Sequence, residues 1–407
     1  MTAFVTDGNQ RASLAVVRAL GRAGIPVVVG EAETRSLAGS SRFCTKTITY
    51  PKPETDKEGF LQRVIEELKN PSYRVVIPIT DITLRLLSSV RSTLPPGIRI
   101  PFPSSAHIER AQDKRQVLLL AQQLGIPCPK THILPEGENL QELPEGISFP
   151  AVVKPRVSRF FRCGRWVSAP VQYALDPESL IEIFRKVHSQ IPDPLVQEKL
   201  EGDGRGVFLL VWNDELKAAF CHRRLREKPP SGGVSVYSES VRLDEKLVEK
   251  SLALLRALEW QGVAMVEFKT DRRDGQAKLM EVNGRFWGSL QLAIDAGMNF
   301  PLILYRLATG ENVVPRLDYK IGIRTRWLLG DLDHLWIRLA HPDSSIELPE
   351  KRVSRLRACL QFMDFFERGT RQEVFRWDDP SPGWFELRQY LRQAFRRTRE
   401  IPVQASA

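Results

Sequence analysis

The sequence predicts an α/β protein with a parallel-sheet domain, a larger strand-rich region and a mainly helical C-terminal part. Three observations carry this expectation. Strands alternate with helices over the first hundred residues, strands dominate from residue 150 to 283, and residues 320–407 are Arg-rich with mainly helical patterning. The chain has 407 residues, enough for two or three domains, and 42% of them are hydrophobic, as in ordinary globular proteins.

The first hundred residues have the pattern of βαβ units. AFVTD and IPVVVG are short apolar strands on either side of a helical stretch from Arg11 to Ala23, and RVVIPIT follows a second amphipathic stretch. This alternation predicts a parallel sheet. The first turn, TDGNQ, lacks the GxGxxG spacing of a dinucleotide site. The turn at 6–12 and the strand end at 78–81 lie where parallel sheets expose loops to ligands, so both are candidates for a substrate site.

A Pro-rich stretch at 95–105, PPGIRIPFPSS, indicates a domain boundary. Asp113 and Lys114 then open a helix that runs to Leu124, and Gly125 ends it. From residue 150 onward, strands are predicted for FPAVVKP, RWVSAPVQYAL, PLVQEKL, GVFLLVW and LKAAFCHRR.

The strands VAMVEFKTD (263–271) and AKLMEVN (277–283) predict a β-hairpin. Glu281 and Asn283 are two residues apart, so their side chains project from one face. The loop length decides whether Glu267 joins them: a two-residue turn sends the carboxylates to opposite faces, whereas an odd loop pairs Glu267 with Glu281. We expect the odd loop. Two carboxylates and an amide on one face would suit Mg²⁺, and a salt-bridged edge carboxylate is the alternative.

Two further strand ends carry groups suited to a nucleotide. FPAVVKP places Lys154 at the end of a buried strand, where its amine is a compact charge for a phosphate. A lysine that extends into water is the alternative. PLVQEKLEGDG runs from an apolar strand into Glu198 and Lys199. A strand that leaves its sheet there offers backbone groups to a purine edge, and a following carboxylate can accept hydrogen bonds from ribose hydroxyls.

In chain order, these motifs resemble the ATP-grasp superfamily. The set comprises Asp113-Lys114 at a helix start, FPAVVKP, VQEKLEGDG, VEFK and MEVNGRFWGS. Within the superfamily, the chain resembles the carboxylate–amine ligases and the predicted ligases similar to carbamoyl-phosphate synthase. The resemblance implies a Rossmann-like domain at 1–104, an ATP-grasp module at 105–315 with lobes at 105–195 and 196–315, and a mainly helical region at 316–407.

For the nucleotide, the resemblance implies ATP held by seven residues: Lys114, Lys154, Glu198, Lys199, Leu200, Glu201 and Asp203. The two lysines would hold the phosphates. Glu198 and Leu200 would meet adenine, largely through the backbone, with Lys199 nearby. Asp203, or Glu201 in its place, would hold the ribose.

For the metal and the chemistry, Glu267, Glu281 and Asn283 would bind one or two Mg²⁺ ions, with Mn²⁺ as a substitute. Arg285 would stabilise the transferring phosphoryl group. Two further candidates follow LKAAFC, where the strand is expected to end. They are Arg224 as an anion clamp and His222 as a general base for an amine, and a structural role is the alternative for each.

The implied reaction joins a carboxylate to an amine. The carboxylate attacks the γ-phosphate of ATP to give an acyl-phosphate and ADP, and the amine then displaces phosphate. Two alternatives stay open. One is a carbamoyl-phosphate-synthase-like enzyme acting on bicarbonate or carbamate, and the other is a non-catalytic ATP-binding module. The expected partners are small carboxylate and amine substrates, and resembling enzymes are commonly homodimers.

The segment after Lys154 departs from the family pattern, which has a glycine-rich loop there. PRVSRFFRCGRWVSA holds a single glycine, Gly164, and four arginines three residues apart: Arg156, Arg159, Arg162 and Arg165. This pattern has two readings. One is a basic lid that covers either phosphates or an acidic co-substrate, and the other is a solvated basic hairpin.

The formal net charge of +10 suits an anionic ligand or surface. No nucleic-acid-binding motif accompanies it, so nucleic acid is not expected. The five scattered cysteines form no CxxC pair, and no signal peptide or membrane-spanning run is evident, which indicates a cytoplasmic protein. The Arg-rich helix expected at 385–401 either docks on the body through its apolar face or contacts an anionic membrane.

Overall fold

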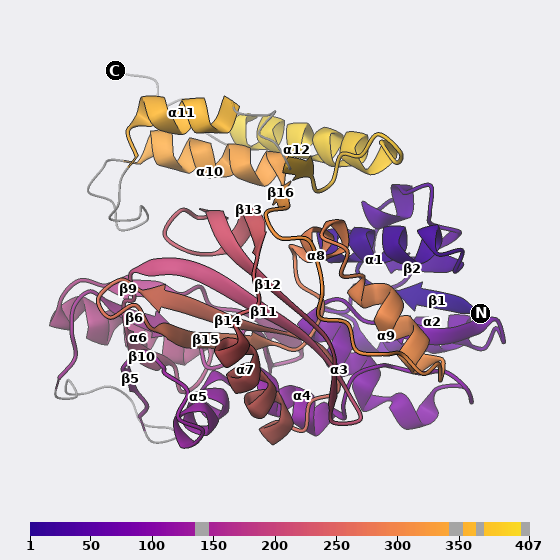
Figure 1. The fold of residues 1–407 in the computed structure, drawn as a ribbon, viewed down its shortest axis with the longest axis horizontal. Coiled ribbons are helices and arrows are strands. Elements are labelled where there is room, and N and C mark those ends of the chain that lie inside the picture. Colours follow the sequence, from indigo (N-terminus) through magenta and orange to yellow (C-terminus); the bar gives the residue numbers. More distant parts are fainter. Residues whose placement is uncertain (135–145, 342–352, 364–369, 400–407) are drawn as a thin grey trace.

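The computed structural model describes residues 1–134, 146–341, 353–363 and 370–399. Its first part is a sheet of four parallel strands in the order β3-β2-β1-β4 (Figure 1). The parallel sheet and three of its strands are as predicted, whereas the edge strand β3 was not predicted. The strands are β1 (Thr2–Val5), β2 (Val27–Glu31), β3 (Lys46–Thr49) and β4 (Tyr73–Ile77). The helices between and after them are α1 (Arg11–Arg22), α2 (Lys57–Leu68) and α3 (Asp81–Ser89).

A smaller lobe follows, with a four-stranded antiparallel sheet in the order β5-β10-β6-β9. Two helices precede its strands in the chain, α4 (Ser105–Gln112) and α5 (Lys114–Gln123), and α5 begins at the capping carboxylate of Asp113 as expected. The remaining elements are β5 (Thr131–His132), β6 (Ala151–Lys154), the hairpin β7 (Phe160–Arg162) and β8 (Arg165–Val167), β9 (Gln172–Ala174), α6 (Pro177–Gln190) and β10 (Leu195–Glu198).

The largest sheet has seven strands in the order β15-β14-β11-β12-β13-β16-β17. Five of these strands are consecutive in the chain: β11 (Gly202–Trp212), β12 (Glu215–Lys228), β13 (Val234–Val241), β14 (Gly262–Asp271) and β15 (Ala277–Asn283). Three helices accompany them, α7 (Glu245–Ala257), α8 (Leu290–Asp295) and α9 (Phe300–Ala308).

The C-terminal region contributes both strands and helices. Strands β16 (Arg324–Arg326) and β17 (Thr370–Gln372) extend the large sheet. Helices α10 (Leu328–Ala340), α11 (Arg355–Met363) and α12 (Ser381–Arg399) form a layer at the top of Figure 1. The same region is tied to the first domain, because the fully buried Arg18 of α1 pairs with Asp379 at 2.8 Å.

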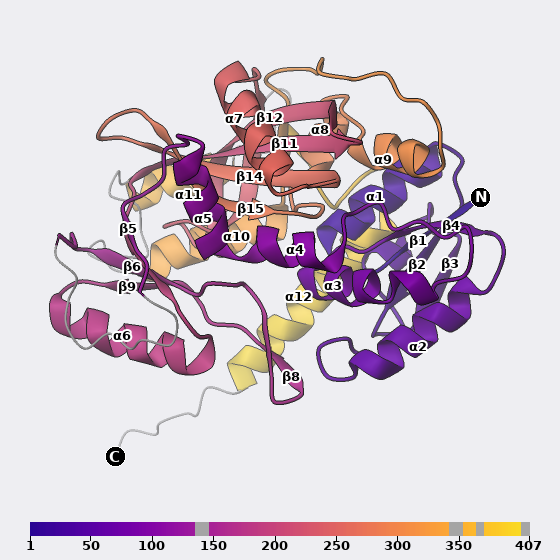
Figure 2. The ribbon, with the colours of Figure 1, turned by 90° about the horizontal axis from the view of Figure 1, so that it is seen from below.

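The described residues form two separate hydrophobic cores. One continuous cluster joins the parallel sheet to the large sheet, with Phe4, Phe102 and Phe208 among its fully buried members. The small lobe has a separate core around Val153 and Phe184. Figure 2 shows the small lobe beside the other two sheets, with its β7–β8 hairpin directed towards the first domain.

Helix α12 only partly follows the amphipathic pattern read from the sequence. Tyr390 donates to Asp333 of α10 at 2.6 Å, which docks the middle of the helix. Leu391, which the helical spacing places on the same apolar face as Tyr390, is 46% exposed. Contact of this helix with an anionic membrane stays a prediction. Among the described residues, no helix is long and apolar enough to cross a bilayer.

Candidate functional site

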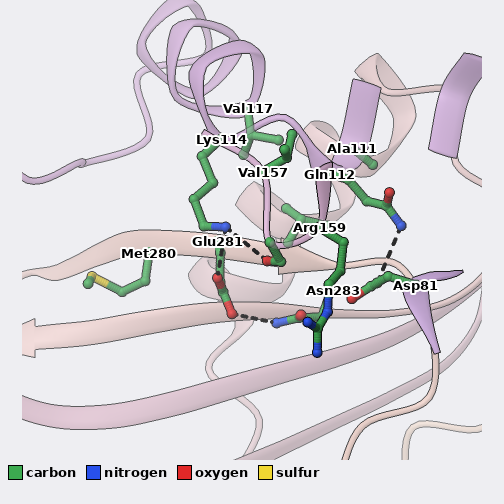
Figure 3. A pocket seen from close by; sticks show the side chains of 12 residues that line it. Asp81, Ala111, Gln112, Lys114, Val117, Val157, Arg159, Met280, Glu281 and Asn283 are labelled. Atoms are coloured by element: carbon green, nitrogen blue, oxygen red, sulfur yellow. Dashed lines mark hydrogen bonds and ion pairs between the residues drawn. The ribbon is translucent and has the colours of Figure 1, made fainter. Parts of the chain in front are cut away.

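A cavity of about 770 Å³ lies where the three sheets meet. The first domain contributes the N-terminal ends of α1 and α3, the small lobe contributes Lys114, Lys154 and Arg159, and the large sheet contributes polar residues of β12, β14 and β15. A smaller recess of about 20 Å³ shares Lys114 with the cavity and is drawn in Figure 3. The size of the cavity is in the range of small-molecule sites.

The β14–β15 hairpin brings the two predicted metal-binding carboxylates together, but not by the expected turn. Glu267 lies opposite Glu281, as predicted. The residues 271–276 lie between the paired residues Thr270 and Ala277, which is an even number, so the expectation of an odd number was wrong. A β-bulge between the Glu267 and Phe268 pairs shifts the register and restores the alignment. Met280 is the extra residue, and it lines the cavity together with Glu281, which successive residues of a regular strand would not do.

Glu281 is the centre of the polar contacts in Figure 3. The Asn283 amide nitrogen donates to it at 2.9 Å, and the Lys114 amine lies 3.7 Å from its other oxygen. Burial works to raise the pKa of Glu281, but Lys114 and Asn283 outweigh it and hold the pKa below its ordinary value. The carboxylate is therefore ionised and ready to accept a cation.

Glu267 is in a different electrostatic position. Its carboxylate accepts a hydrogen bond from Arg224 at 2.5 Å. Burial nevertheless raises the pKa of Glu267, and the neighbouring Glu281 carboxylate adds to the rise. Arg224 also donates to Glu227 at 2.7 Å and to the Gly233 carbonyl at 3.0 Å, so the predicted anion clamp is bound to three acceptors of the protein itself.

Two lysines stand beside these carboxylates. Lys114 donates to the Ser158 hydroxyl at 3.1 Å, and Lys154 lines the cavity at the end of β6. Burial lowers the pKa of Lys154 to about 8, although Glu281 acts in the opposite direction. Lys269, which the sequence reasoning missed, also lines the cavity. It follows Glu267 by two positions in the same strand, so period-2 spacing was the signal that could have found it.

Arg285 reaches the cavity from the end of β15, as the sequence suggested. Its guanidinium donates to Asp81 at 3.0 Å, at the start of α3. The negative charge of Asp81 raises the pKa of Arg285, so the side chain keeps its positive charge. Asp81 is the last residue of the strand end at 78–81 that was suggested for a substrate site, and it lines the cavity together with Ile79 and Thr80.

The residues expected to hold adenosine lie outside the cavity lining. Glu198 accepts from the backbone of Lys130 at 2.9 Å and from Arg273 at 2.7 Å, so its side chain serves an ion-pair network. Lys199 and Glu201 pair with each other at 3.4 Å. The Leu200 side chain is buried, and Asp203 is an exposed partner of Arg272. The Asp203 carboxylate is 74% exposed, and the role of these residues towards adenosine stays a prediction.

His222 does not occupy the place of a general base. Strand β12 continues through it to Lys228, so the strand does not end there as expected. The imidazole is 1% exposed, stacks edge-on against Phe208 and lies 3.5 Å from the Ser289 hydroxyl. Burial lowers the pKa of His222 well below its ordinary range. The side chain is a neutral part of the interior and does not line the cavity.

The Arg-rich segment forms the hairpin β7–β8, and its arginines have different contacts. Arg156 pairs with Asp113 at 2.7 Å, and Arg162 donates to the Ser189 carbonyl at 2.6 Å. Arg159 lines the cavity, as a lid residue would. The hairpin also touches the first domain, because Lys57 lies 4.7 Å from the Phe161 ring and Arg85 lies 5.1 Å from the Trp166 ring.

The donor set fits a magnesium ion. No group of three or more His, Cys, Asp and Glu side chains suited to a metal occurs in the described part of the chain. Two carboxylates and an amide are nevertheless the kind of set with which Mg²⁺ is bound when phosphate oxygens complete its shell. The Asn283–Glu281 hydrogen bond uses the amide nitrogen, which leaves the amide oxygen for a cation.

The fold is that of ATP-grasp proteins, and the chain is similar to them in sequence as well. Residues 190–330 match a family described as ATP-grasp in the biosynthetic pathway with Ter operon. The chain is 23% identical to a D-aspartate ligase of Enterococcus faecium over 302 residues, which is 70% of either chain. It is 22% identical to the carbamoyl phosphate synthase large chain of Thermotoga petrophila over 230 residues, only 20% of that longer protein.

Solved structures show the same fold at low sequence identity. An L-amino acid ligase from Bacillus licheniformis superposes with a TM-score of 0.58 and 19% identity, covering 77% of this chain and 75% of that one. N5-carboxyaminoimidazole synthetase from Staphylococcus aureus, solved with ADP, gives a TM-score of 0.60 and 15% identity, with 79% and 80% covered.

Proposed function

We propose that the chain is an Mg-ATP-dependent ligase that joins a carboxylate to an amine and releases ADP and phosphate. The observation that carries the proposal is the pairing of Glu267 with Glu281 across β14 and β15, beside Lys154 in the cavity wall. Carboxylates, an amide and lysines around one point are what phosphoryl transfer requires, because that reaction depends on positioning and charge neutralisation.

Each side chain has a role in this proposal. Glu267, Glu281 and Asn283 hold the metal, which when bound neutralises charge on the phosphate oxygens. Lys114 and Lys154 hold the phosphates, and the lowered pKa of Lys154 leaves it charged over most of the neutral range. A substrate carboxylate oxygen attacks the γ-phosphorus, and the bond to ADP breaks.

Arg285 completes the set at the acyl end. Held by Asp81, its guanidinium stabilises the acyl-phosphate, whose acyl carbon the amine then attacks as phosphate leaves and the nitrogen loses a proton. The segment from Glu198 to Leu200 serves adenine through its backbone, because the Glu198 side chain already pairs with Arg273. D-Aspartate, the substrate in the name of one relative, is the first carboxylate to assay.

Turnover with a metabolite pool tests the proposal. The protein is incubated with Mg-ATP and candidate carboxylates and amines, and nucleotides and new masses are followed by mass spectrometry. We expect ADP, phosphate and a condensation product in equal amounts, with a loss of roughly a hundredfold or more in Glu281→Gln. Glu215→Gln, which changes an exposed carboxylate far from the cavity lining, is the matched control.

Three results would contradict the proposal in different ways. AMP and pyrophosphate would exclude an acyl-phosphate route. Turnover dependent on bicarbonate alone would favour the carbamoyl-phosphate-synthase-like alternative. ATP binding without any turnover would favour a non-catalytic module.

A further inference from the structure

The cavity has a second polar end, away from the metal-binding carboxylates. It is formed by Gln10, Arg11 and Ala12 at the start of α1, by the loop that leads into β13, and by the segment Trp287–Ser289. Arg11 and Gly288 are direct neighbours: a Cβ on Gly288 would lie 3.0 Å from the Arg11 guanidinium and 4.0 Å from Val234. The three segments therefore meet at one place.

Arg11 is held firmly in this wall. Its guanidinium pairs with the buried carboxylate of Glu373, which comes from the C-terminal region, and lies 3.9 Å over the ring of Trp327. The side chain is 10% exposed. An arginine fixed in this way loses little rotamer entropy when it binds an anion.

The start of α1 is an open helix N-terminus. Gln10 makes no side-chain cap, and the first turn holds no acidic residue, so its N–H groups and the positive end of the dipole face the cavity. The start of α3 is different. Thr80 and Thr83 form a capping box there, and Asp7 accepts from the backbone of Ile79 and Thr80. Only the first of these two helix ends remains available to a ligand.

Two buried polar groups at the same end lack a partner. The Trp287 indole nitrogen and the Ser235 hydroxyl have no hydrogen-bond partner among the described residues, and these residues are 2% and 8% exposed. Both line the cavity. A buried donor without a partner is costly, so a ligand that either side chain turns to meet would relieve that cost.

We propose that this end of the cavity binds a second carboxylate of the substrate, so that the substrate class is a dicarboxylic amino acid such as aspartate or glutamate. This inference rests on the proposed function, in which Arg285 receives the reacting carboxylate. The guanidinium, the indole and the helix amides are all donors, so the group they bind is an acceptor and an anion.

Both arginines line the same cavity, one at each of its polar ends. The Arg11 guanidinium lies beside Gly288, and Arg285 precedes Gly288 by three residues. A substrate with two carboxylates can place one at Arg285 and the other at Arg11. Aspartate and glutamate are of this kind, whereas a monocarboxylate such as alanine leaves the Arg11 end of the cavity empty.

Direct binding to the full-length protein tests the inference. Dissociation constants are measured by calorimetry for D- and L-aspartate and D- and L-glutamate, with D- and L-alanine for comparison, in wild type and Arg11→Gln. We expect at least one dicarboxylate to bind wild type at least tenfold more tightly than alanine. Arg11→Gln weakens that binding roughly tenfold to a hundredfold and leaves the affinity for a non-hydrolysable ATP analogue unchanged.

Arg22→Gln is the matched control, since Arg22 lies on the same helix and pairs with Asp378 at 2.6 Å but does not line the cavity. Arg11→Lys tests whether charge alone restores binding, and melting curves show that each variant is folded. Equal binding of alanine and the dicarboxylates, unchanged binding in Arg11→Gln, or a preference for O-phosphoserine would each overturn the inference.

The outcomes separate this inference from the ligase proposal. Dicarboxylate binding that depends on Arg11, without ADP formation with any amine, supports the site and removes the ligase function. ADP formation with a monocarboxylate that Arg11→Gln leaves intact removes the site and keeps the ligase function.

Discussion

The carboxylate of Glu267 and the guanidinium of Arg224 form a 2.5 Å ion pair in the wall of the cavity. The pair does not fully offset the cost of burying Glu267, because burial and the nearby Glu281 raise its pKa. Such residual cost is common where a site is built for a ligand that arrives later. It gives the pair an energetic signature that can be measured without substrate.

At pH 8 without metal, the free energy of unfolding of Glu267→Gln is expected to exceed that of wild type by roughly 1 kcal/mol. A carboxyl with a raised pKa costs nothing below its unfolded pKa, and the cost grows as pH rises through the folded pKa. The advantage of the variant should therefore shrink towards pH 5. Urea unfolding in EDTA at both pH values measures it, and a variant less stable than wild type at pH 8 would contradict the expectation.

Arg224→Met should destabilise the protein by roughly 3–5 kcal/mol, because it leaves Glu267 and Glu227 buried without their shared partner. In the Glu267→Gln background, the same change should cost measurably less, since one of the two carboxylates is gone. A double-mutant cycle from urea unfolding gives the coupling. Strict additivity would show that the contact contributes nothing.

The β7–β8 hairpin should depend on its aromatic contacts with the first domain. Trp166→Ala removes the ring that faces Arg85, a contact that contributes roughly 0.5–2 kcal/mol. Hydrogen exchange in residues 158–170 should then become faster, and ATP affinity should fall if Arg159 is a lid residue. Phe160→Ala is the matched control, because Phe160 and Phe161 project from opposite faces of β7. Equal exchange in both variants would speak against docking of the hairpin.

Glu373 should make stability fall between pH 5 and pH 8. Burial raises the pKa of Glu373 to about 7, although Arg11 and Arg376 act in the opposite direction. Because the unfolded carboxyl ionises at lower pH, the folded state loses stability as pH rises through this interval, by about 3 kcal/mol at most. Glu373→Gln removes the slope. Melting curves across the range measure the difference, and parallel curves for the two proteins would refute it.

Much of the site could be predicted because strands have a period of two. Glu281 and Asn283 had to share a face, and the strand end had to bring Arg285 close to them. The bulge at Met280 could not be predicted, since AKLMEVN carries no glycine or proline to mark an extra residue. The turn length alone therefore led to the right pairing for the wrong reason.

The errors concern residues whose partners are far away in sequence. Glu198 pairs with Arg273 on the β14–β15 hairpin, a contact that no local pattern reveals. His222 was expected at a strand end, but the stretch up to Lys228 contains no strand breaker before Pro229, which was a readable sign that β12 continues. Arg11 lies in the turn segment suspected of a substrate role, whereas its partner Glu373 comes from the other end of the chain.

The bulge at Met280 also links two features that would look independent when related chains are compared. A turn with an even number of residues needs the bulge to align the carboxylates, and a turn with an odd number needs none. A chain that gains or loses one residue in the turn must therefore lose or gain the bulge to keep its metal ligands. An alignment would record two separate gaps, but the pleat of the sheet requires the two changes to go together.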